Sequence, residues 1–335
     1  MTMREVAARA GVSTKTVSNV LRGAGGASPT TRERVLAAAR DLGYRLNPGA
    51  AALRSGRRGA IALAVPTLQQ PTCALLAAEL MRASGPVQVV LELTRGEADA
   101  EAALLGGSWR GRCDALVLIP RGTDPARLAP GDVEGAVVLL AEDGPAGLSA
   151  ITCPPRLQTA LVADHLRGLG RRRAAVLGAA DPADRWTGTC ARGLRGAGLT
   201  VEPGAVVRLA DPDGVRGGVE AMTRLLHRGP DVDAVVCHND AVASGALSTL
   251  LRRGARVPED VVVIGRGDTE TASFATPSLT SVSCAARAAA RAVMGLLRAL
   301  PATGPARPGA VEVRPRLTVR ASSAPAPQAP WARRW

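Results

Sequence analysis

Residues 2–21 read TMREVAARAGVSTKTVSNVL, two short amphipathic segments with a glycine between them. Thr2 and Glu5 have the spacing of a capping box, in which each side chain bonds the other residue's backbone amide at the start of a helix. Gly11 can adopt the left-handed conformation that ends such a helix. A second helix is expected from Thr14 to about Leu21, so the stretch predicts a helix-turn-helix.

The second of these helices has an apolar face and a polar face. Ser13 is placed to cap it, and Val17, Val20 and Leu21 fall at helical spacing on the side that packs inward. Short polar side chains with one cation remain on the outside, and they suit base edges in a major groove. A solvated helix face has the same composition, so the pattern alone leaves both interpretations open. The outer positions are Thr14, Lys15, Ser18 and Asn19.

A third helix is expected directly afterwards. Ser28 and Pro29 form a helix start, as an N-cap followed by a proline in the first turn, and Gly43 can end the helix. The first 45 residues therefore predict a small three-helix unit. The apolar stripe of its third helix is Val35, Ala38, Ala39 and Leu42.

The net charge of +13 is unevenly distributed along the 335 residues. Residues 1–58 carry eleven basic and three acidic side chains, a net charge of +8. Residues 59–300 carry twenty-five of each and are neutral, whereas residues 301–335 carry a net +5. A basic head on a neutral body indicates a module that binds a polyanion, joined to a part that need not.

The head resembles the DNA-binding head of LacI/GalR-type bacterial transcription regulators. The stretches that carry the resemblance are REVAARAGVSTKTVSNVLRG (4–23) and SPTTRERVLAAARDLGYRLNP (28–48). The resemblance implies that the helix-turn-helix reads an operator, the double-stranded DNA site of a regulator. The residues that it implies contact DNA are Ser13, Thr14, Lys15, Thr16, Ser18 and Asn19. Many family members have arginine at the position of Asn19, and asparagine would favour adenine over guanine.

The segment after the head matches the hinge helix of that family. By the resemblance Asn47, Ala50 and Leu53 enter the minor groove, where the leucine wedges between base pairs at the operator centre. The contacts that a bent duplex permits offset the cost of unstacking. A flexible basic linker is the alternative interpretation of these residues.

From Ala60 the pattern changes to short apolar runs that alternate with helical stretches. This alternation predicts an α/β fold with parallel sheets. The expected strands are 61–65, 87–93, 115–119, 137–140, 174–177, 234–237 and 261–264, and the expected helices are 75–83, 157–169, 215–227, 241–253 and 285–299. No glycine-rich dinucleotide loop and no P-loop is present, so no cofactor is expected.

Three stretches of the body resemble the effector domain of the same family, which has a two-lobed periplasmic-binding-protein fold. They are ADHLRGLGRRRAAVLG (163–178), the segment 233–265 beginning DAVVCHND, and TPSLTSV (276–282). The expected divisions are a head over 1–45, a hinge over 46–58, a body over 59–320 and a disordered tail over 321–335. The first lobe is expected at about 59–153 and 283–308, and the second at about 154–282 and 309–320.

The match places Arg185, Asn239 and Asp240 in the cleft between the lobes, where family members bind a small-molecule effector. A guanidinium and a carboxylate can fix vicinal hydroxyls or a purine edge, although a capping or lobe-bridging role is the alternative for each. The cleft also departs from the family. Gln70-Pro71-Thr72-Cys73 has no sugar-stacking ring, Pro154-Pro155 replaces an Asp-Asn pair, and Gly265-Arg266-Gly267-Asp268 has lost an aromatic and an acid. The sequence therefore predicts an acidic or phosphorylated effector.

Other classes of function have little support. The three histidines, His165, His227 and His238, show no triad or metal spacing, so neither an enzyme nor a metal site is expected. The six cysteines form no C-x-x-C pair and are expected to be buried apolar residues. No transmembrane or signal segment is visible, which predicts a cytoplasmic protein. The sequence thus predicts a homodimeric regulator, with a solute-binding protein or a constitutive repressor without effector control as alternatives.

Overall fold

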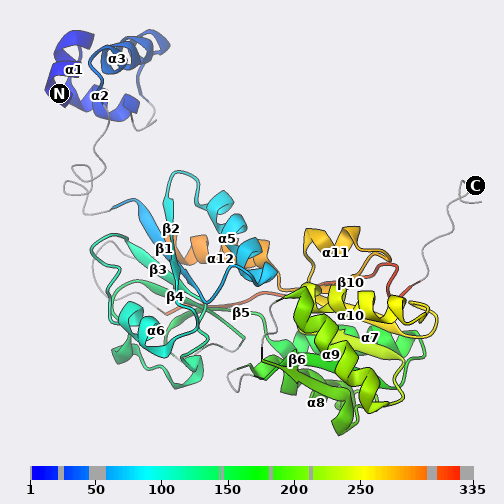
Figure 1. Cartoon of the computed structure of the whole chain (residues 1–335). Helices are drawn as coiled ribbons and strands as arrows, with labels where there is room; N and C mark the ends of the chain where they lie inside the picture. The colour runs from blue at the N-terminus through cyan, green and yellow to red at the C-terminus, as the bar shows by residue number, and fades with distance from the viewer. Residues whose placement is uncertain are drawn as a thin grey trace, which may run out of the picture. The chain divides into compact units, whose positions relative to one another are not determined.

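The computed structural model describes residues 2–21, 26–44, 58–142, 144, 147–180, 184–210, 214–299 and 308–324. The chain divides into two compact units, Met1–Arg58 and Gly59–Trp335, which are described separately (Figure 1). The predicted hinge residues Asn47, Ala50 and Leu53 lie outside the described residues.

The head consists of three helices, α1 (Met3–Ala10), α2 (Thr14–Leu21) and α3 (Pro29–Asp41). The predicted capping box is confirmed, because the amide of Glu5 donates to the Thr2 hydroxyl and the Thr2 amide donates to the Glu5 carboxylate. Gly11 ends α1 with a φ of 61°, and the Ser28 side chain caps α3. These local bonds set the helix ends, while one small core holds the helices together. The buried residues of this core are Val6, Ala7, Ala10, Val17, Val20, Val35, Ala38 and Ala39.

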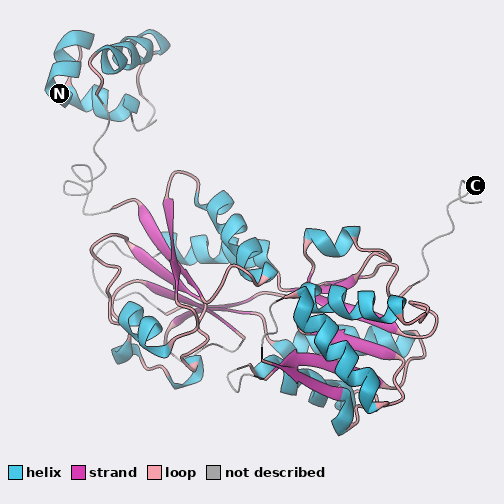
Figure 2. Cartoon of the chain, in the orientation of Figure 1, coloured by secondary structure: helices cyan, strands magenta, loops and turns pink. Residues whose placement is uncertain are grey.

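The first lobe of the body is a parallel sheet between two layers of helix (Figure 2). Its strand order is β11-β5-β4-β3-β1-β2, and every neighbouring pair is parallel. The strands are β1 (Ala60–Val65), β2 (Gln88–Leu93), β3 (Ala115–Leu118), β4 (Val137–Ala141), β5 (Ser149–Thr152) and β11 (Ala310–Glu312). Helices α5 (Pro71–Ser84) and α12 (Ala286–Ala299) share one apolar cluster, and α6 (Ala98–Leu105) contributes to another.

The second lobe repeats this arrangement with the order β12-β10-β9-β8-β6-β7, in which only β12 is antiparallel to its neighbour. Its strands are β6 (Ala174–Ala179), β7 (Val206–Leu209), β8 (Ala234–Cys237), β9 (Val262–Gly267), β10 (Thr280–Ser283) and β12 (Leu317–Thr318). Two apolar clusters cover the two faces of this sheet. The helices are α7 (Pro155–Gly168), α8 (Arg185–Gly196), α9 (Val215–Arg228), α10 (Asp240–Arg252) and the short α11 (Glu270–Phe274).

The chain crosses between the lobes three times, from β5 to α7, from β10 to α12, and from β11 to β12. The expected boundary at 309 is wrong, because β11 pairs with β5 and so belongs to the first lobe. The expectation that residue 321 begins a disordered tail is also wrong. The Ser322 hydroxyl donates to the carbonyl of Val263, and Ser323 contacts Thr280 and His165. These hydroxyls satisfy buried polar groups, which fixes the chain as far as residue 324.

Helices α9 and α10 approach each other closely through two glycines. A Cβ atom on Gly218 would overlap the carbonyl oxygen of Val242, and one on Gly245 would overlap that of Val215. In contrast, a Cβ on Gly295 of α12 would meet no atom within 4 Å. The backbones of α9 and α10 therefore approach each other at a distance that only glycine permits at these two positions, whereas Gly295 has open space.

We expect Gly245→Ala to lower the free energy of unfolding by about 3 kcal/mol, because the added methyl must push two packed helices apart. The control Gly295→Ala should raise it by up to about 1 kcal/mol, since alanine is the better helix former. Urea unfolding of the intact chain measures both values. Equal effects of the two substitutions would contradict the close packing of α9 and α10.

Candidate functional site

The outer face of α2 carries the polar residues that the sequence singled out. Thr14 and Lys15 are exposed, whereas Thr16 and Asn19 are half-buried. The Ser13 hydroxyl accepts a hydrogen bond from the Thr16 amide at 3.1 Å and lies 2.9 Å from its hydroxyl. Ser13 and Thr16 therefore form the start of α2 as well as part of its surface.

Ser18 departs from the expected arrangement. It is only 9% exposed and is buried together with Val17 and Val20, so its assignment to the outer face is wrong. Helix α2 packs against both α1 and α3, so its buried surface is broader than the apolar stripe and includes Ser18 beside it. Its small hydroxyl tolerates this position, which a larger polar side chain would not.

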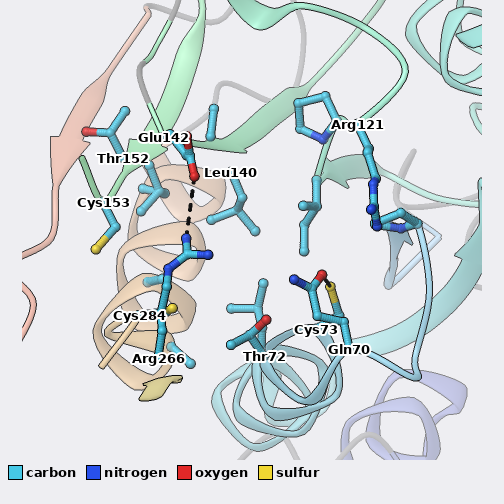
Figure 3. A pocket seen from close by; sticks show the side chains of 18 of the residues that line it. Gln70, Thr72, Cys73, Arg121, Leu140, Glu142, Thr152, Cys153, Arg266 and Cys284 are labelled. Carbon is cyan, nitrogen blue, oxygen red and sulfur yellow. Dashed lines mark hydrogen bonds and ion pairs between the residues drawn. The ribbon is translucent and has the colours of Figure 1, made fainter. Parts of the chain in front are cut away.

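A cavity of about 260 Å³ lies between the two lobes of the body. Gln70, Thr72 and Cys73 reach it from the start of α5, and Figure 3 shows their side chains pointing towards Arg121 and Leu140. None of the described residues that line it is Phe, Tyr or Trp. Residues Gln70–Cys73 thus bring no aromatic ring on which a sugar face could stack, as their sequence predicts.

Charged side chains line the cavity from both lobes. Of the described lining residues, three are arginines, Arg121, Arg185 and Arg266, and two are acids, Glu142 and Asp184. The loop that carries Arg121 is pinned by Glu101, a buried carboxylate that accepts hydrogen bonds from the amides of residues 121, 122 and 123 at 2.8–3.1 Å. Glu101 therefore positions Arg121 from behind the cavity wall, a role that the sequence does not reveal.

Arg266 projects from the end of β9 and is held on three sides. Its Nε donates to Oε1 of Gln158 at 2.8 Å, and its guanidinium lies 5.4 Å from the ring centroid of Trp186. Its Nη2 lies 3.4 Å from Oε1 of Glu142, which belongs to the other lobe (Figure 3). Burial opposes the charge of Arg266, while Cys284 and Glu142 raise its pKa. The guanidinium therefore stays charged in a largely buried position.

His238 also lines the cavity, packed edge-on against Trp186 with ring centroids 5.4 Å apart. Its Nδ1 is buried and makes no hydrogen bond to a described residue, and it lies 3.8 Å from Oδ1 of Asp184. Burial, together with the charge of Arg266, lowers the pKa of His238 to about 4. The imidazole is therefore neutral at pH 7, with a polar nitrogen available beside the cavity.

The predicted trio of effector-binding residues is only partly brought together. Arg185, the first residue of α8, lines the cavity, but neither Asn239 nor Asp240 does. The Asn239 side chain caps α10 by accepting from the amide of Val242 at 2.8 Å. The capping alternative left open by the sequence therefore describes Asn239.

Asp240 has no exposed surface and is surrounded by donors. Its Oδ2 accepts from the amide and the hydroxyl of Thr269, each at 2.8 Å, and its Oδ1 accepts from Ser281 at 2.5 Å. Burial raises the pKa of Asp240, and the hydrogen bonds from Ser281 and Thr269 oppose that shift. The carboxylate therefore binds protein groups rather than facing the cavity.

Two of the six cysteines depart from the expectation that all are buried apolar residues. Cys73, Cys153 and Cys284 line the cavity, and the last two are only partly buried. Burial raises the pKa of Cys153, and it raises that of Cys284 to about 11, so both stay protonated thiols at pH 7. Within the described residues no cluster of three or more His, Cys, Asp or Glu side chains could hold a metal ion. In the same part of the chain, every helix is too short or too polar to cross a membrane.

Comparisons with known proteins match both units. Residues 2–47 match the family described as bacterial regulatory proteins, lacI family, and residues 163–323 match a periplasmic binding protein-like domain. Over 333 residues the chain is 32% identical to the HTH-type transcriptional regulator GntR of Pseudomonas aeruginosa, covering 96% of this chain and 95% of that protein.

Two solved structures extend the comparison. A complex of the transcriptional regulator CelR with cellobiose is similar with a TM-score of 0.66 at 28% identity, over 96% of this chain and all of that one. The lac repressor dimer bound to operator and the anti-inducer ONPF has a TM-score of 0.77 over 96% of this chain and 99% of that one. Its identity is 24%, so this second likeness concerns the fold.

The lowered pKa of His238 predicts a pH dependence of stability. The unfolded chain, with a histidine pKa near 6.5, takes up a proton before the folded chain does, so stability falls as the pH drops from about 6.5 towards 4. Between about pH 7 and pH 5 this loss is roughly 2 kcal/mol. Urea unfolding at both pH values should show that the free energy of unfolding falls less between pH 7 and pH 5 in His238→Gln than in the unchanged protein, by that amount. The buried Asp240 titrates in both proteins and cancels, so an unchanged loss would contradict a buried neutral imidazole.

Proposed function

The chain belongs to the lacI family of bacterial regulatory proteins and is a DNA-binding transcription regulator, and from this premise we propose that it is a homodimeric repressor under the control of a small-molecule effector. The observation that carries the proposal is that residues 1–58, which contain the helix-turn-helix, have a net charge of +8, whereas residues 59–300 of the two-lobed body are neutral. A single helix-turn-helix reads one half-site, so a dimer would read a palindromic operator. A regulator of this kind is not an enzyme.

The proposed DNA contacts come from α2 and from the hinge. Thr14 and Lys15 are free to reach base edges or phosphates, and Asn19 has the bidentate amide that recognises adenine. Ser13, Thr16 and the buried Ser18 would act mainly by orienting the helix. The hinge contacts of the proposal are Asn47, Ala50 and Leu53.

The proposed dimer has a candidate contact on the second lobe. Phe274, the only phenylalanine of the chain, is 79% exposed, and Leu251 is 41% exposed. Leu251 also lines a shallow hollow together with Leu247 and Ala275. Apolar side chains exposed beside a hollow are typical of a protein contact, and a second copy of this chain is the occupant that the family indicates.

The proposed effector site is the cavity between the lobes, with Arg185 among its ligands and Asn239 and Asp240 supporting its wall. The CelR structure contains cellobiose, a neutral sugar. Among the described residues, the lining of the cavity here includes no Phe, Tyr or Trp, and it includes three arginines and two acids. An acidic or phosphorylated effector suits this lining better, because a guanidinium binds carboxylates and phosphates in a bidentate manner. An effector that changes the angle between the lobes would change the spacing of the two hinges.

We expect the intact chain to bind a palindromic duplex with an affinity that falls steeply as salt concentration rises, because binding releases counterions from phosphates. A fragment of residues 59–335, which form a separate compact unit, should keep its fold and lose this binding. Fluorescence anisotropy with labelled duplexes measures both proteins. If the fragment binds DNA as well as the intact chain, the head is not the DNA-binding module.

Leu53→Ala should weaken binding to the operator by about 1–3 kcal/mol, because the smaller side chain cannot wedge an unstacked base step. Binding to a non-specific duplex should barely change, since it depends on phosphate contacts. The same anisotropy titrations give both values, with circular dichroism as the control for folding. Equal losses on the two duplexes would identify residues 46–58 as a basic linker only.

A further inference from the structure

The cation of Arg266 is enclosed but incompletely paired. Its side chain is 13% exposed, and two of its five N–H groups donate to described residues, one to Gln158 and one to Glu142. A buried guanidinium needs both a counter-charge and hydrogen-bond partners, because leaving either out costs free energy. Arg266 therefore lies beside the cavity with spare donors.

The two hydrogen bonds of Arg266 differ in quality and in origin. The bond to Gln158 joins groups of the same lobe at 2.8 Å, whereas the contact with Glu142 crosses between the lobes at 3.4 Å. Charge-assisted bonds between a guanidinium and a carboxylate are usually 2.7–2.9 Å long. Glu142 is 27% exposed and touches the guanidinium through a single oxygen. It supplies the counter-charge without supplying good geometry.

A second polar group at the same place also lacks a partner. His238 is 5% exposed, lines the cavity, and its Nδ1 makes no hydrogen bond to a described residue. Arg266 and His238 pack against the same indole, that of Trp186. The two side chains thus place polar atoms that lack hydrogen-bond partners among the described residues beside the same part of the cavity.

We propose that, in the absence of effector, the carboxylate of Glu142 occupies the place at Arg266 that an anionic group of the effector takes when it binds. On binding, this anionic group displaces Glu142 from Arg266. The inference rests on the proposed effector function of this cavity. A carboxylate or phosphate can accept two parallel N–H bonds from the guanidinium, which one oxygen of Glu142 does not. A neutral sugar is a poor replacement, because displacing Glu142 would remove the one carboxylate among the described residues that directly contacts Arg266, and would leave only the more distant charge of Asp184.

Removing the charge of Glu142 should therefore strengthen the binding of anions. We expect Glu142→Gln, which keeps the size of the side chain, to bind gluconate or glucose 6-phosphate about tenfold more tightly than the unchanged protein. Binding of neutral glucose should not improve, and Arg266→Gln should lose anion binding. Isothermal titration calorimetry on the full chain measures each affinity.

A matched control is available in the same body. Glu312 also bridges the lobes, through Arg156 at 2.8 Å, but neither residue lines the cavity. Glu312→Gln should leave the affinity for every probe unchanged. This control shows whether a gain in Glu142→Gln comes from removing a carboxylate that competes for Arg266 or merely from weakening a contact between the lobes. Circular dichroism melting shows whether each variant folds.

Weaker or unchanged anion binding by Glu142→Gln would overturn the inference. Weaker binding would mean that Glu142 itself binds the ligand, by accepting hydrogen bonds from its hydroxyls. So would a gain of equal size in Glu312→Gln, or no binding of any anionic probe by either the unchanged protein or Glu142→Gln. Operator binding, measured on the same preparations, separates the two levels. If the unchanged protein does not bind the operator, the proposed function is wrong. If it binds the operator but gives one of the three contrary results above, only the place-holding role of Glu142 is wrong.

Discussion

The buried carboxylate of Asp240 fixes the part of the second lobe from which the cavity is built. It joins the start of α10 to Thr269, just after β9, and to Ser281 in β10. Gly265 lies directly against it, because a Cβ there would overlap Oδ1 of Asp240. Since three segments meet on one charged group without solvent, the end of β9 has little freedom, and Arg266 leaves the strand in a defined direction. The cavity wall therefore depends on a residue that never reaches the cavity.

The crossings between the lobes extend this constraint. Asp268 follows β9 and accepts from Arg320 at 2.7 Å and from the Thr318 hydroxyl at 2.8 Å, which ties the last crossing to the same corner. At the first crossing Pro154 and Pro155 restrict the backbone before α7. A change in the angle between the lobes would bend these crossing segments. The contacts that differ between open and closed arrangements are then those that cross the cleft, such as Arg266 with Glu142.

The sequence predicts what is local and misses what depends on distant partners. The helix ends of the head are predictable because Thr2, Glu5 and Gly11 act within a few residues of themselves. The central strands are predictable from continuous apolar runs. Strands such as β10 (TSVS) and β11 (AVE) carry no such run and exist because neighbouring strands pair with them. Helix α8 contains three glycines, yet it forms because Trp186, Cys190 and Leu194 bury one face. The motif around Asn239 and Asp240 can be recognised in the sequence, but the direction in which the Asp240 carboxylate points cannot. The contact between Arg266 and Glu142 cannot be predicted either, because the two residues are 124 positions apart in the chain.

Charge distribution limits how an effector could control this regulator. The largest share of the positive charge is the +8 of residues 1–58, because residues 59–300 are neutral and residues 301–335 carry +5. An anionic effector adds one or two negative charges to that neutral body, in a solution where the screening length is about 8 Å at physiological salt. This added negative charge is small compared with the charge of the head, and pairing of the effector's anionic group with Arg266 reduces its effect further. Control of DNA binding therefore cannot come from net charge. It must come from geometry, that is, from whether the lobes hold the two hinges of a dimer at the spacing at which both can fold in the groove.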